Sequence, residues 1–378
     1  METPFQAGNY SLDGGADKRT CQTGADLKRP DRRFPRIYGI PGYIQAMDDL
    51  STPADLPVIP LVDAGQGGPP AVAEAERARF TDLFRAGRDH YGPLFLGLGD
   101  RLTKRWLADC PTPYRADLDA CAAQLDHAGV YMLNLSYEWS CTTAVGRPPS
   151  GRGNRMLRTL DWPLHGLGRN VIVARQGGGA GDWLNVTWPG FVGVATAMAP
   201  GRFAAALNQP PMKTCTTSCW LDWAIERTRV WRRRLMPPTH LLRLAFETCP
   251  TYEAAKTLLT ETPIAVPAFF SLSGTAPHEG CVIERTETDA FIRDGGSAAI
   301  ANHWVVGPFT GRSRGYDSPG RFARMEASRD GVEDGFDWVV PPILNPTTRL
   351  AVTANAATGG LRVRGYETAG AATRDFIL

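Results

Sequence analysis

The stretch that decides the interpretation is Tyr137-Glu138-Trp139-Ser140-Cys141-Thr142-Thr143, followed by Arg158-Thr159-Leu160-Asp161-Trp162. The residues before it, 130–136, form an apolar run that predicts a strand ending close to a cysteine. An Arg-x-x-Asp pair then follows within twenty residues of that cysteine. This order is typical of an enzyme whose nucleophile becomes a new N-terminus when the chain cuts itself. We therefore expect cleavage of the bond between Ser140 and Cys141.

The chemistry of a thiol explains why such a cut would be needed. Only the thiolate is a good nucleophile, and a cysteine of pKa ~8.5 is mostly protonated at neutral pH. The nearest histidines along the chain, His127 and His165, form no Cys/His signature with Cys141. An N-terminal cysteine supplies its own base, because its α-amine titrates near ~7.7–8.0. Cleavage before Cys141 is thus a chemical requirement of this mechanism.

This stretch resembles the cysteine branch of the N-terminal nucleophile (Ntn) hydrolases. The resemblance is strongest to the acid ceramidase and N-acylethanolamine acid amidase group, whose relatives include choloylglycine hydrolases and penicillin V acylases. Residues 129–138 resemble the strand that runs into that group's cleavage site, and residues 56–63 resemble its amino-terminal subunit. Residues 253–274 resemble its helix–strand unit, so the likeness spans roughly residues 50–368.

The resemblance gives roles to the two charged residues after the cysteine. It implies that Arg158 lies beside the sulfur and favours the thiolate. It also implies that Asp161 accepts a hydrogen bond from the α-ammonium group of Cys141. In an extended strand these two side chains point to opposite faces, so we expect a bend at Asp161. The alternative for this pair is a surface salt bridge at the end of a strand.

Three further site residues follow from the resemblance alone. Asn302, in the sequence Ile300-Ala301-Asn302-His303-Trp304, matches the family's oxyanion asparagine, and Asn208 matches the end of its Gly-rich hairpin. An amide side chain can donate to an oxyanion without ionising itself. Arg321 would be the second active-site arginine, with Arg324 and Arg314 as alternatives.

The expected fold is α+β. Strand patterns dominate residues 130–207 and recur over residues 268–303 and 350–366, and helical patterns lie before, between and after them. The resemblance implies a four-layer αββα Ntn-hydrolase sandwich with a mainly helical N-terminal segment. We expect a flexible tail over residues 1–35, an N-terminal segment over 36–140 and the catalytic domain over 141–378.

Composition restricts the partners and the compartment. A net charge of +2 with neutral histidines argues against nucleic acid as a partner. Residues 227–234 hold five arginines, which could form a solvated helix face or touch phosphates or an anionic membrane. Residues 1–29 contain no apolar secretory core, and no apolar run is long enough to span a membrane. A cytoplasmic protein with free thiols is the resulting expectation.

Other motifs do not support a cofactor or a metal. The Gly-rich residues 176–182 lack the Gly-Lys-Ser/Thr ending of a phosphate-binding loop, so they predict a hairpin turn. Cys215 and Cys219 have the wrong spacing for a zinc knuckle. There is no Gly-x-Ser-x-Gly elbow, which argues against a serine esterase. We therefore expect neither a cofactor nor a metal.

The predicted function is a self-processing cysteine amidase that hydrolyses N-acyl substrates of the ceramide or fatty-acid amide type through a thioester on Cys141. Its partners would be that substrate, a transient membrane surface and, for each cleavage fragment, the other fragment. The alternatives are an acyltransferase of the same fold and a catalytically silent lipid-binding relative. Aromatic residues could line an acyl pocket or belong to the core: Trp139, Trp162, Trp183, Trp188, Trp304 and Phe309.

Overall fold

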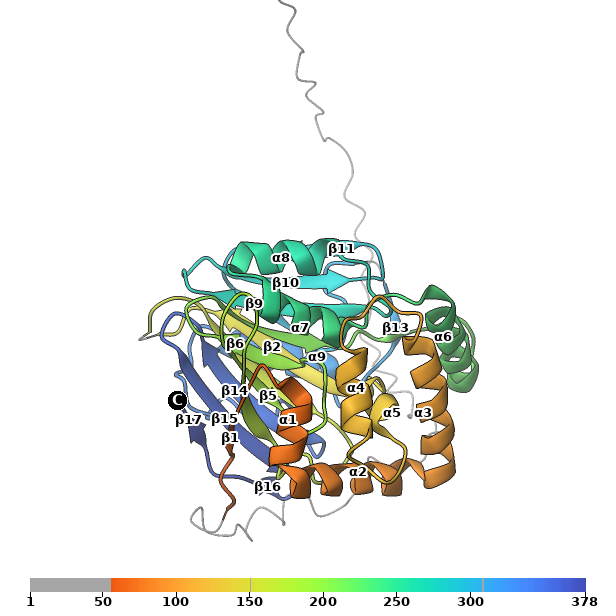
Figure 1. The fold of residues 1–378 in the computed structure, drawn as a ribbon. Coiled ribbons are helices and arrows are strands. Elements are labelled where there is room, and N and C mark those ends of the chain that lie inside the picture. Colours follow the sequence, from red (N-terminus) through yellow and green to blue (C-terminus); the bar gives the residue numbers. More distant parts are fainter. Residues whose placement is uncertain (1–55, 150, 308) are drawn as a thin grey trace, which may run out of the picture. The chain divides into compact units, whose positions relative to one another are not determined.

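Two β-sheets form the centre of the computed structural model, which describes residues 56–378 except 150 and 308 (Figure 1). The larger sheet contains, in spatial order, β1 (Leu61–Gly65), β4 (Ile172–Gln176), β5 (Trp183–Thr187), β6 (Thr196–Ala199), β7 (Phe203–Asn208), β9 (Ala268–Gly274), β10 (Gly280–Arg285) and β11 (Ala290–Arg293). The other contains β12 (Ala298–Ile300), β2 (Ser140–Gly146), β3 (Arg155–Asp161), β14 (Thr348–Asn355), β15 (Gly360–Glu367) and β16 (Gly370–Ala371), with β17 (Phe376–Ile377) beside β15.

The sheets pack face to face and carry helices on their outer sides. Strands β2 and β3 of one sheet contact β7 and β9 of the other. Helices α7 (Pro238–Thr248) and α8 (Tyr252–Glu261) cover the larger sheet, and α9 (Ser318–Ser328) covers β2 and β12. Strand alternation supplies apolar side chains to both layers, so that Phe203 meets Phe246 of α7 while Met325 of α9 packs in a separate cluster with Ala144. This confirms the predicted α+β four-layer sandwich.

The N-terminal part of the described chain is mainly helical. Its helices are α1 (Gly68–Ala75), α2 (Arg77–Tyr91), α3 (Pro93–Leu107), α4 (Arg115–Ala122) and α5 (Val130–Asn134). Strand β1 precedes them and pairs in parallel with β4, so this part contributes directly to the larger sheet. Helix α6 (Cys219–Arg233) follows β7 and the short strand β8 (Met212–Lys213), which pairs with β13 (Gly311–Arg312). The predicted tail over residues 1–35 lies outside the described residues.

The strand predicted over residues 130–136 is wrong, because this run forms the short helix α5. Val130, Tyr131 and Asn134 are buried at helical spacing. Polar contacts to other elements fix the helical turn: the Met132 amide donates to the Asp100 carboxylate at 3.0 Å, and the Asn134 side-chain amide donates to the carbonyl of Gly190 at 2.9 Å. The apolar run therefore reflects burial and does not report backbone geometry.

Residues 192–195 also lie in the stretch where strand patterns dominate the sequence, but β6 begins only at Thr196. The Val192 amide donates to the Asn134 side-chain oxygen at 2.7 Å, and the Val194 amide donates to the Thr239 carbonyl at 3.0 Å. These partners outside the sheet replace the ladder hydrogen bonds that a strand would need.

Candidate active site

Cys141 lies near the start of β2, and its sulfur faces the opposite sheet. Arg158 of the neighbouring strand β3 donates from Nη2 to the Cys141 Sγ at 3.1 Å. Its Nη1 donates to the Asn208 Oδ1 at 2.9 Å and to the Thr143 Oγ1 at 3.2 Å. Thr143 and Arg158 are directly paired in the β2–β3 ladder, and Asn208 ends β7 of the other sheet. Two sheets therefore supply the surroundings of the thiol.

The opposite face of β2 is held by Arg321 of α9. Its Nη1 donates to the backbone carbonyl of Cys141 at 2.7 Å and to the Thr142 Oγ1 at 2.8 Å. Its Nη2 donates to the Asn302 Oδ1 at 2.9 Å. The same guanidinium lies 3.5 Å from the Asp161 Oδ2, which forms a fully buried ion pair.

Asp161 lies on this second face, and the bend predicted there is wrong. Strand β3 continues through Asp161, and the irregularity in register falls in the facing strand β14, between Thr348 and Leu350. Extended geometry thus sends Arg158 and Asp161 to opposite faces of the sheet. The Asp161 carboxylate accepts from the Thr348 Oγ1 at 2.9 Å and from the Ser140 Oγ at 3.4 Å.

All six predicted site residues converge on the Ser140–Cys141 linkage, and each is at most 1% exposed. Of the three candidate arginines, Arg321 contacts Cys141. Arg314 instead donates to the Tyr137 carbonyl at 3.2 Å and to the Pro210 carbonyl at 2.7 Å. Arg324 is exposed on α9. The geometry therefore favours Arg321 as the second active-site arginine.

The side-chain amides of Asn302 and Asn208 already form hydrogen bonds within the chain. The Asn302 Oδ1 accepts from the Cys141 backbone amide at 2.9 Å, while its Nδ2 donates to the Gln209 carbonyl at 2.8 Å. The Asn208 Nδ2 donates to the Ile300 and Ala301 carbonyls at 3.3 and 3.1 Å. Both amide nitrogens therefore already have acceptors, and an oxyanion role would require them to rearrange.

Burial dominates the electrostatics of the site. It raises the pKa of the Cys141 thiol to about 11, against the opposing influence of Arg158. Burial also raises the pKa of Asp161, and Arg321 is the main influence that opposes this rise. At neutral pH the thiol of this chain is therefore protonated.

Sequence reasoning missed three residues that shape the site. Thr143 was accessible to it, because a residue two positions after Cys141 shares its face of a strand. Thr348 reaches Asp161 only through the pairing of β14 with β3, which no local signal reveals. Tyr137 adopts a left-handed backbone with φ of 49°, which is uncommon for an aromatic residue.

Comparison with known proteins identifies relatives. The chain is 27% identical over 263 residues to the N-acylethanolamine-hydrolyzing acid amidase of Cavia porcellus, a match that covers 68% of this chain and 65% of that protein. It is 33% identical over 200 residues to the acid ceramidase of Balaenoptera acutorostrata scammoni, covering 47% of this chain and 49% of that protein. It spans about half to two-thirds of the length of such curated relatives. No family model matches the chain.

Among solved structures, the Caenorhabditis elegans N-acylethanolamine-hydrolyzing acid amidase ortholog aligns with a TM-score of 0.45 at 17% identity. That alignment covers 57% of this chain and 93% of the other, and at this level of likeness it carries no further argument. The relationship rests on the sequence matches. The chain is a sequence relative of the N-acylethanolamine-hydrolyzing acid amidases and acid ceramidases, as its motifs predicted.

Proposed function

We propose that this protein is a self-processing cysteine amidase that cuts the amide bond of N-acyl substrates through a thioester on Cys141. The observation that carries the proposal is the environment of the thiol. The guanidinium of Arg158 lies 3.1 Å from the sulfur, and Arg321 holds the backbone carbonyl of the same residue at 2.7 Å. The relatives' names supply the reaction class, N-acyl amide hydrolysis.

Self-cleavage would use the groups around Ser140. The Cys141 sulfur attacks the Ser140 carbonyl carbon, the C–N bond between the two residues breaks, and the nitrogen takes up the thiol proton. Water then hydrolyses the resulting thioester, leaving a carboxylate on Ser140 and a free amine on Cys141. Asn302 accepts a hydrogen bond from that nitrogen in the uncleaved chain, so it is placed to orient the amine afterwards.

The same groups would then serve turnover. The α-amine of Cys141 removes the thiol proton, and Arg158 stabilises the thiolate that attacks the substrate carbonyl. The amide C–N bond of the substrate then breaks, and the substrate's amine leaves with a proton from the α-ammonium group of Cys141. Water hydrolyses the thioester on Cys141 and releases the acid. Because Cys141 is fully buried in the uncleaved chain, the substrate reaches the thiol only after the preceding segment moves.

An apolar groove near the site favours a substrate whose acyl part is a fatty acid. It lies between α3 and α6, has a volume of about 330 Å³ and ends at residues 136–138, just before the proposed cleavage site. Its apolar lining includes Phe95, Leu98, Leu102, Trp106, Met132, Leu135, Trp223 and Trp231. Of the aromatic residues considered from the sequence, Trp139, Trp162, Trp183 and Trp188 are instead buried core residues.

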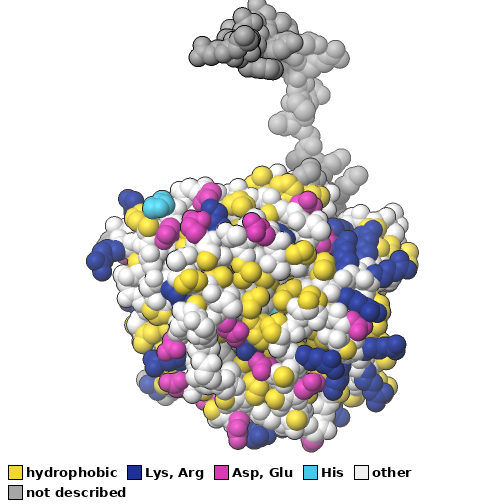
Figure 2. All heavy atoms as spheres, turned by 45° about the horizontal axis from the view of Figure 1, so that its top comes forward, with side chains coloured by type: hydrophobic (Ala, Val, Ile, Leu, Met, Phe, Trp, Pro, Cys, Tyr) yellow, Lys and Arg dark blue, Asp and Glu magenta, His cyan; other side chains and the backbone are white. Residues whose placement is uncertain are grey.

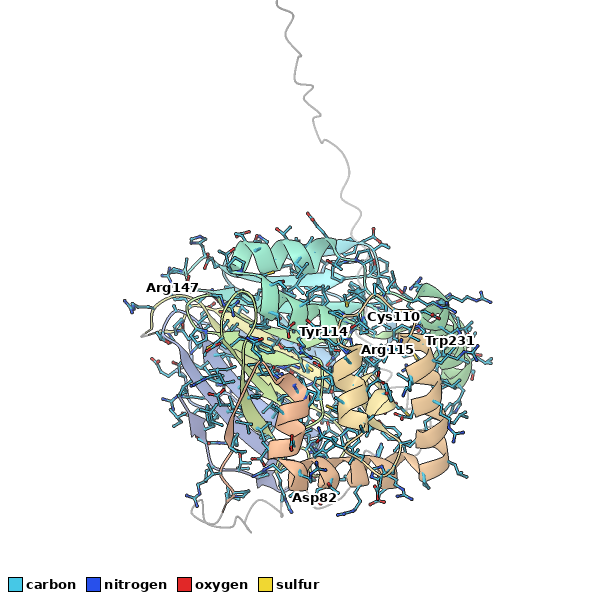
Figure 3. All side chains as sticks on the ribbon, viewed as in Figure 1. Asp82, Cys110, Tyr114, Arg115, Arg147 and Trp231 are labelled. Atoms are coloured by element: carbon cyan, nitrogen blue, oxygen red, sulfur yellow. The ribbon has the colours of Figure 1, made fainter. Side chains whose placement is uncertain are left out.

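The outer surface of this groove supports contact with a lipid surface. Leu94 of α3 is 89% exposed and Trp220 of α6 is 76% exposed, and Trp231, labelled in Figure 3, lies on α6 and lines the groove. Basic side chains gather along the same side of the molecule, which Figure 2 shows in dark blue. Apolar side chains beside basic ones suit an anionic bilayer. Flotation with phosphatidylserine vesicles, against phosphatidylcholine vesicles as control, tests this contact.

Cytoplasm remains the proposed compartment. The seven cysteines that the structure describes are all free thiols, which fits a reducing environment. Among residues 56–149, 151–307 and 309–378, none of the helices is both long enough and apolar enough to cross a bilayer.

The test of the proposed function is intact mass of fresh protein, followed by assay with a fatty amide. We expect the parent to yield fragments 1–140 and 141–378, whereas Cys141→Ala stays whole and inactive. Cys281→Ala is the matched control, because it removes another fully buried thiol from the same sandwich. Amide hydrolysis by Cys141→Ala would refute the proposal.

A further inference from the structure

A hydroxyl and an imidazole lie beside Asn302, and neither belongs to the site residues predicted from the sequence. Ser318 is the first residue of α9 and is only 4% exposed, while His303 follows Asn302 directly in the chain. The Asn302 backbone amide donates to the Ser318 Oγ at 2.9 Å, and the same oxygen lies 2.8 Å from the His303 Nδ1. One buried oxygen atom therefore joins the three residues.

The single hydrogen of the Ser318 hydroxyl decides the direction of these hydrogen bonds. Its oxygen already accepts from a backbone amide, so its hydrogen needs an acceptor, which the Nδ1 of a neutral His303 supplies. Burial and the positive charges of Arg321 and Arg293 lower the pKa of His303, which favours the neutral ring. Phe322 of α9 packs edge-on against this ring, with the centroids 5.2 Å apart. His303 thus accepts through Nδ1 and carries its own hydrogen on Nε2.

Asn302 connects this pair to the backbone of the nucleophile. Its Oδ1 accepts from the Cys141 amide and from the Arg321 Nη2, each at 2.9 Å. Strand β12 ends at Ile300, so the Ser318 hydroxyl supplies the acceptor that a strand partner would otherwise provide for the Asn302 amide. Without that hydroxyl the amide would be a buried donor that must find another acceptor, and Asn302 would have to shift.

The nitrogen that Asn302 holds is used twice in the proposed function. It belongs to the peptide bond that breaks, and after cleavage it becomes the α-amine that removes the thiol proton of Cys141. A general base must lie within hydrogen-bond reach of the proton that it takes, and a displacement of about 1 Å can cost about 10²-fold in rate. The rate of reaction therefore depends on how firmly Asn302 is held.

We propose that Ser318 and His303 are positioning residues, which hold Asn302 and through it the Cys141 nitrogen that acts as the general base. The inference rests on the proposed function and adds two residues to its machinery. Ser318 fixes the Asn302 backbone, and His303 fixes Ser318 by accepting its hydroxyl hydrogen. In the described structure neither side chain lines the apolar groove, so both act on the rate of reaction and leave substrate binding unchanged.

The first test changes Ser318 and measures kcat and KM of the self-processed protein with N-dodecanoylethanolamine. Ser318→Ala should lower kcat by about 10-fold or more and keep KM within about two-fold, because the misplaced amine slows the chemistry alone. Ser318→Thr keeps the hydroxyl and should retain kcat within about three-fold. Thr251→Ala is the matched control, because it removes another hydroxyl that accepts from a backbone amide at a helix N-terminus, on α8. It should leave both constants unchanged.

The second test separates the hydrogen bond of His303 from its packing. His303→Asn offers an acceptor oxygen at the atom that corresponds to Nδ1, so kcat should stay within about three-fold of the parental value. His303→Leu fills the space without an acceptor and should lower kcat by about 10-fold. Equal losses in the two variants would overturn the inference, since packing or titration of the ring would then explain them.

A double variant shows whether the two residues act through one path. Ser318→Ala combined with His303→Leu should lower kcat by about the same 10-fold as either single change, because each breaks the same connection to Asn302. A loss of about 100-fold, the product of two independent effects, would overturn the inference.

The proposed function and the inference fail in different ways. A parental kcat in processed Ser318→Ala, or a raised KM with kcat unchanged, overturns the inference and leaves the proposed function standing. A parent protein that neither cuts itself nor hydrolyses the amide rejects both. If Ser318→Ala is not processed, the comparison of His303→Asn with His303→Leu decides the question.

Discussion

One buried arginine packs against each face of strand β2, and only one of the two has a carboxylate partner among the described residues. Arg158, on the face toward the other sheet, meets the thiol and neutral oxygens, and among the described residues it has no carboxylate partner. Arg321, on the face toward α9, is paired with Asp161. An unpaired buried cation keeps its charge available for a thiolate, whereas a paired one anchors the backbone. The first face is thus suited to chemistry and the second to holding Cys141 in position.

The largest expected effect comes from breaking the second face. Arg321→Met leaves the Asp161 carboxylate buried without its ion-pair partner, so we expect a loss of about 3–5 kcal/mol in the free energy of unfolding. Urea unfolding in a Cys141→Ala background, where every variant is uncleaved, measures this. Arg324→Met on the exposed side of α9 should stay within about 0.5 kcal/mol. A loss below about 1 kcal/mol for Arg321→Met would remove the distinction between the faces.

Breaking the first face should act on chemistry instead. Arg158→Met removes the cation beside the sulfur, so we expect self-cleavage to slow by about 10²–10³-fold, the usual range for losing one preorganised donor. The rate of fragment appearance on denaturing gels measures this. In the Cys141→Ala background the same change should destabilise less than Arg321→Met, because it leaves no carboxylate unpaired. The reverse order of stabilities would contradict the comparison.

A pH series sharpens the comparison by separating acid unfolding from site chemistry. His240 of α7 is fully buried, and burial lowers its pKa to about 3, with Arg243 adding to the effect. The unfolded chain binds this proton near pH ~6.5 and the folded chain does not, so stability falls as pH drops from about 6.5 toward 3. We expect about 2 kcal/mol lost by pH 5 at this residue.

His240→Gln should remove that part of the pH dependence, which thermal unfolding at pH 7 and pH 5 would show. The same variant then allows self-cleavage to be followed at acid pH with less unfolding. A parent protein equally stable at both pH values would contradict the prediction.

The smallest expected effect concerns Ser140, whose side chain lies on the second face of β2. Its hydroxyl donates to Asp161 at 3.4 Å, so Ser140→Ala should cost about 1 kcal/mol of stability. Cleavage should persist within a few-fold of the parental rate, because the attacking group is the thiol. Complete loss of processing, seen by intact mass, would show that this hydroxyl takes part in the cut.

The sequence predicted most of the layered architecture because its apolar periodicity was preserved in regular elements. Strands β7, β9, β14 and β15 lie within about two residues of the stretches in which strand patterns were expected, and helices α7, α8 and α9 lie between those stretches, as expected. The helix within residues 130–136 was not predicted, because its helical turn depends on Asp100 and Gly190, which are distant in sequence. Apolar content indicated burial there but could not distinguish strand from helix.

The site was partly accessible from local sequence. The Arg158 and Asp161 pair follows Cys141 closely, whereas Asn208, Asn302 and Arg321 could be identified only through resemblance, since 180 residues separate Arg321 from Cys141. What no local pattern showed was the division of these groups between two faces of β2. That division depends on strand register and on α9 packing behind the sheet.

Strand β1 has a consequence for the processed molecule. It lies before the proposed cut, yet it pairs with β4 inside the larger sheet. Once the chain is cut, unfolding becomes the dissociation of two polypeptides, and the melting temperature should rise with protein concentration. The uncut Cys141→Ala protein, being one chain, should melt at a concentration-independent temperature. The two forms would thus differ in molecularity while sharing one fold.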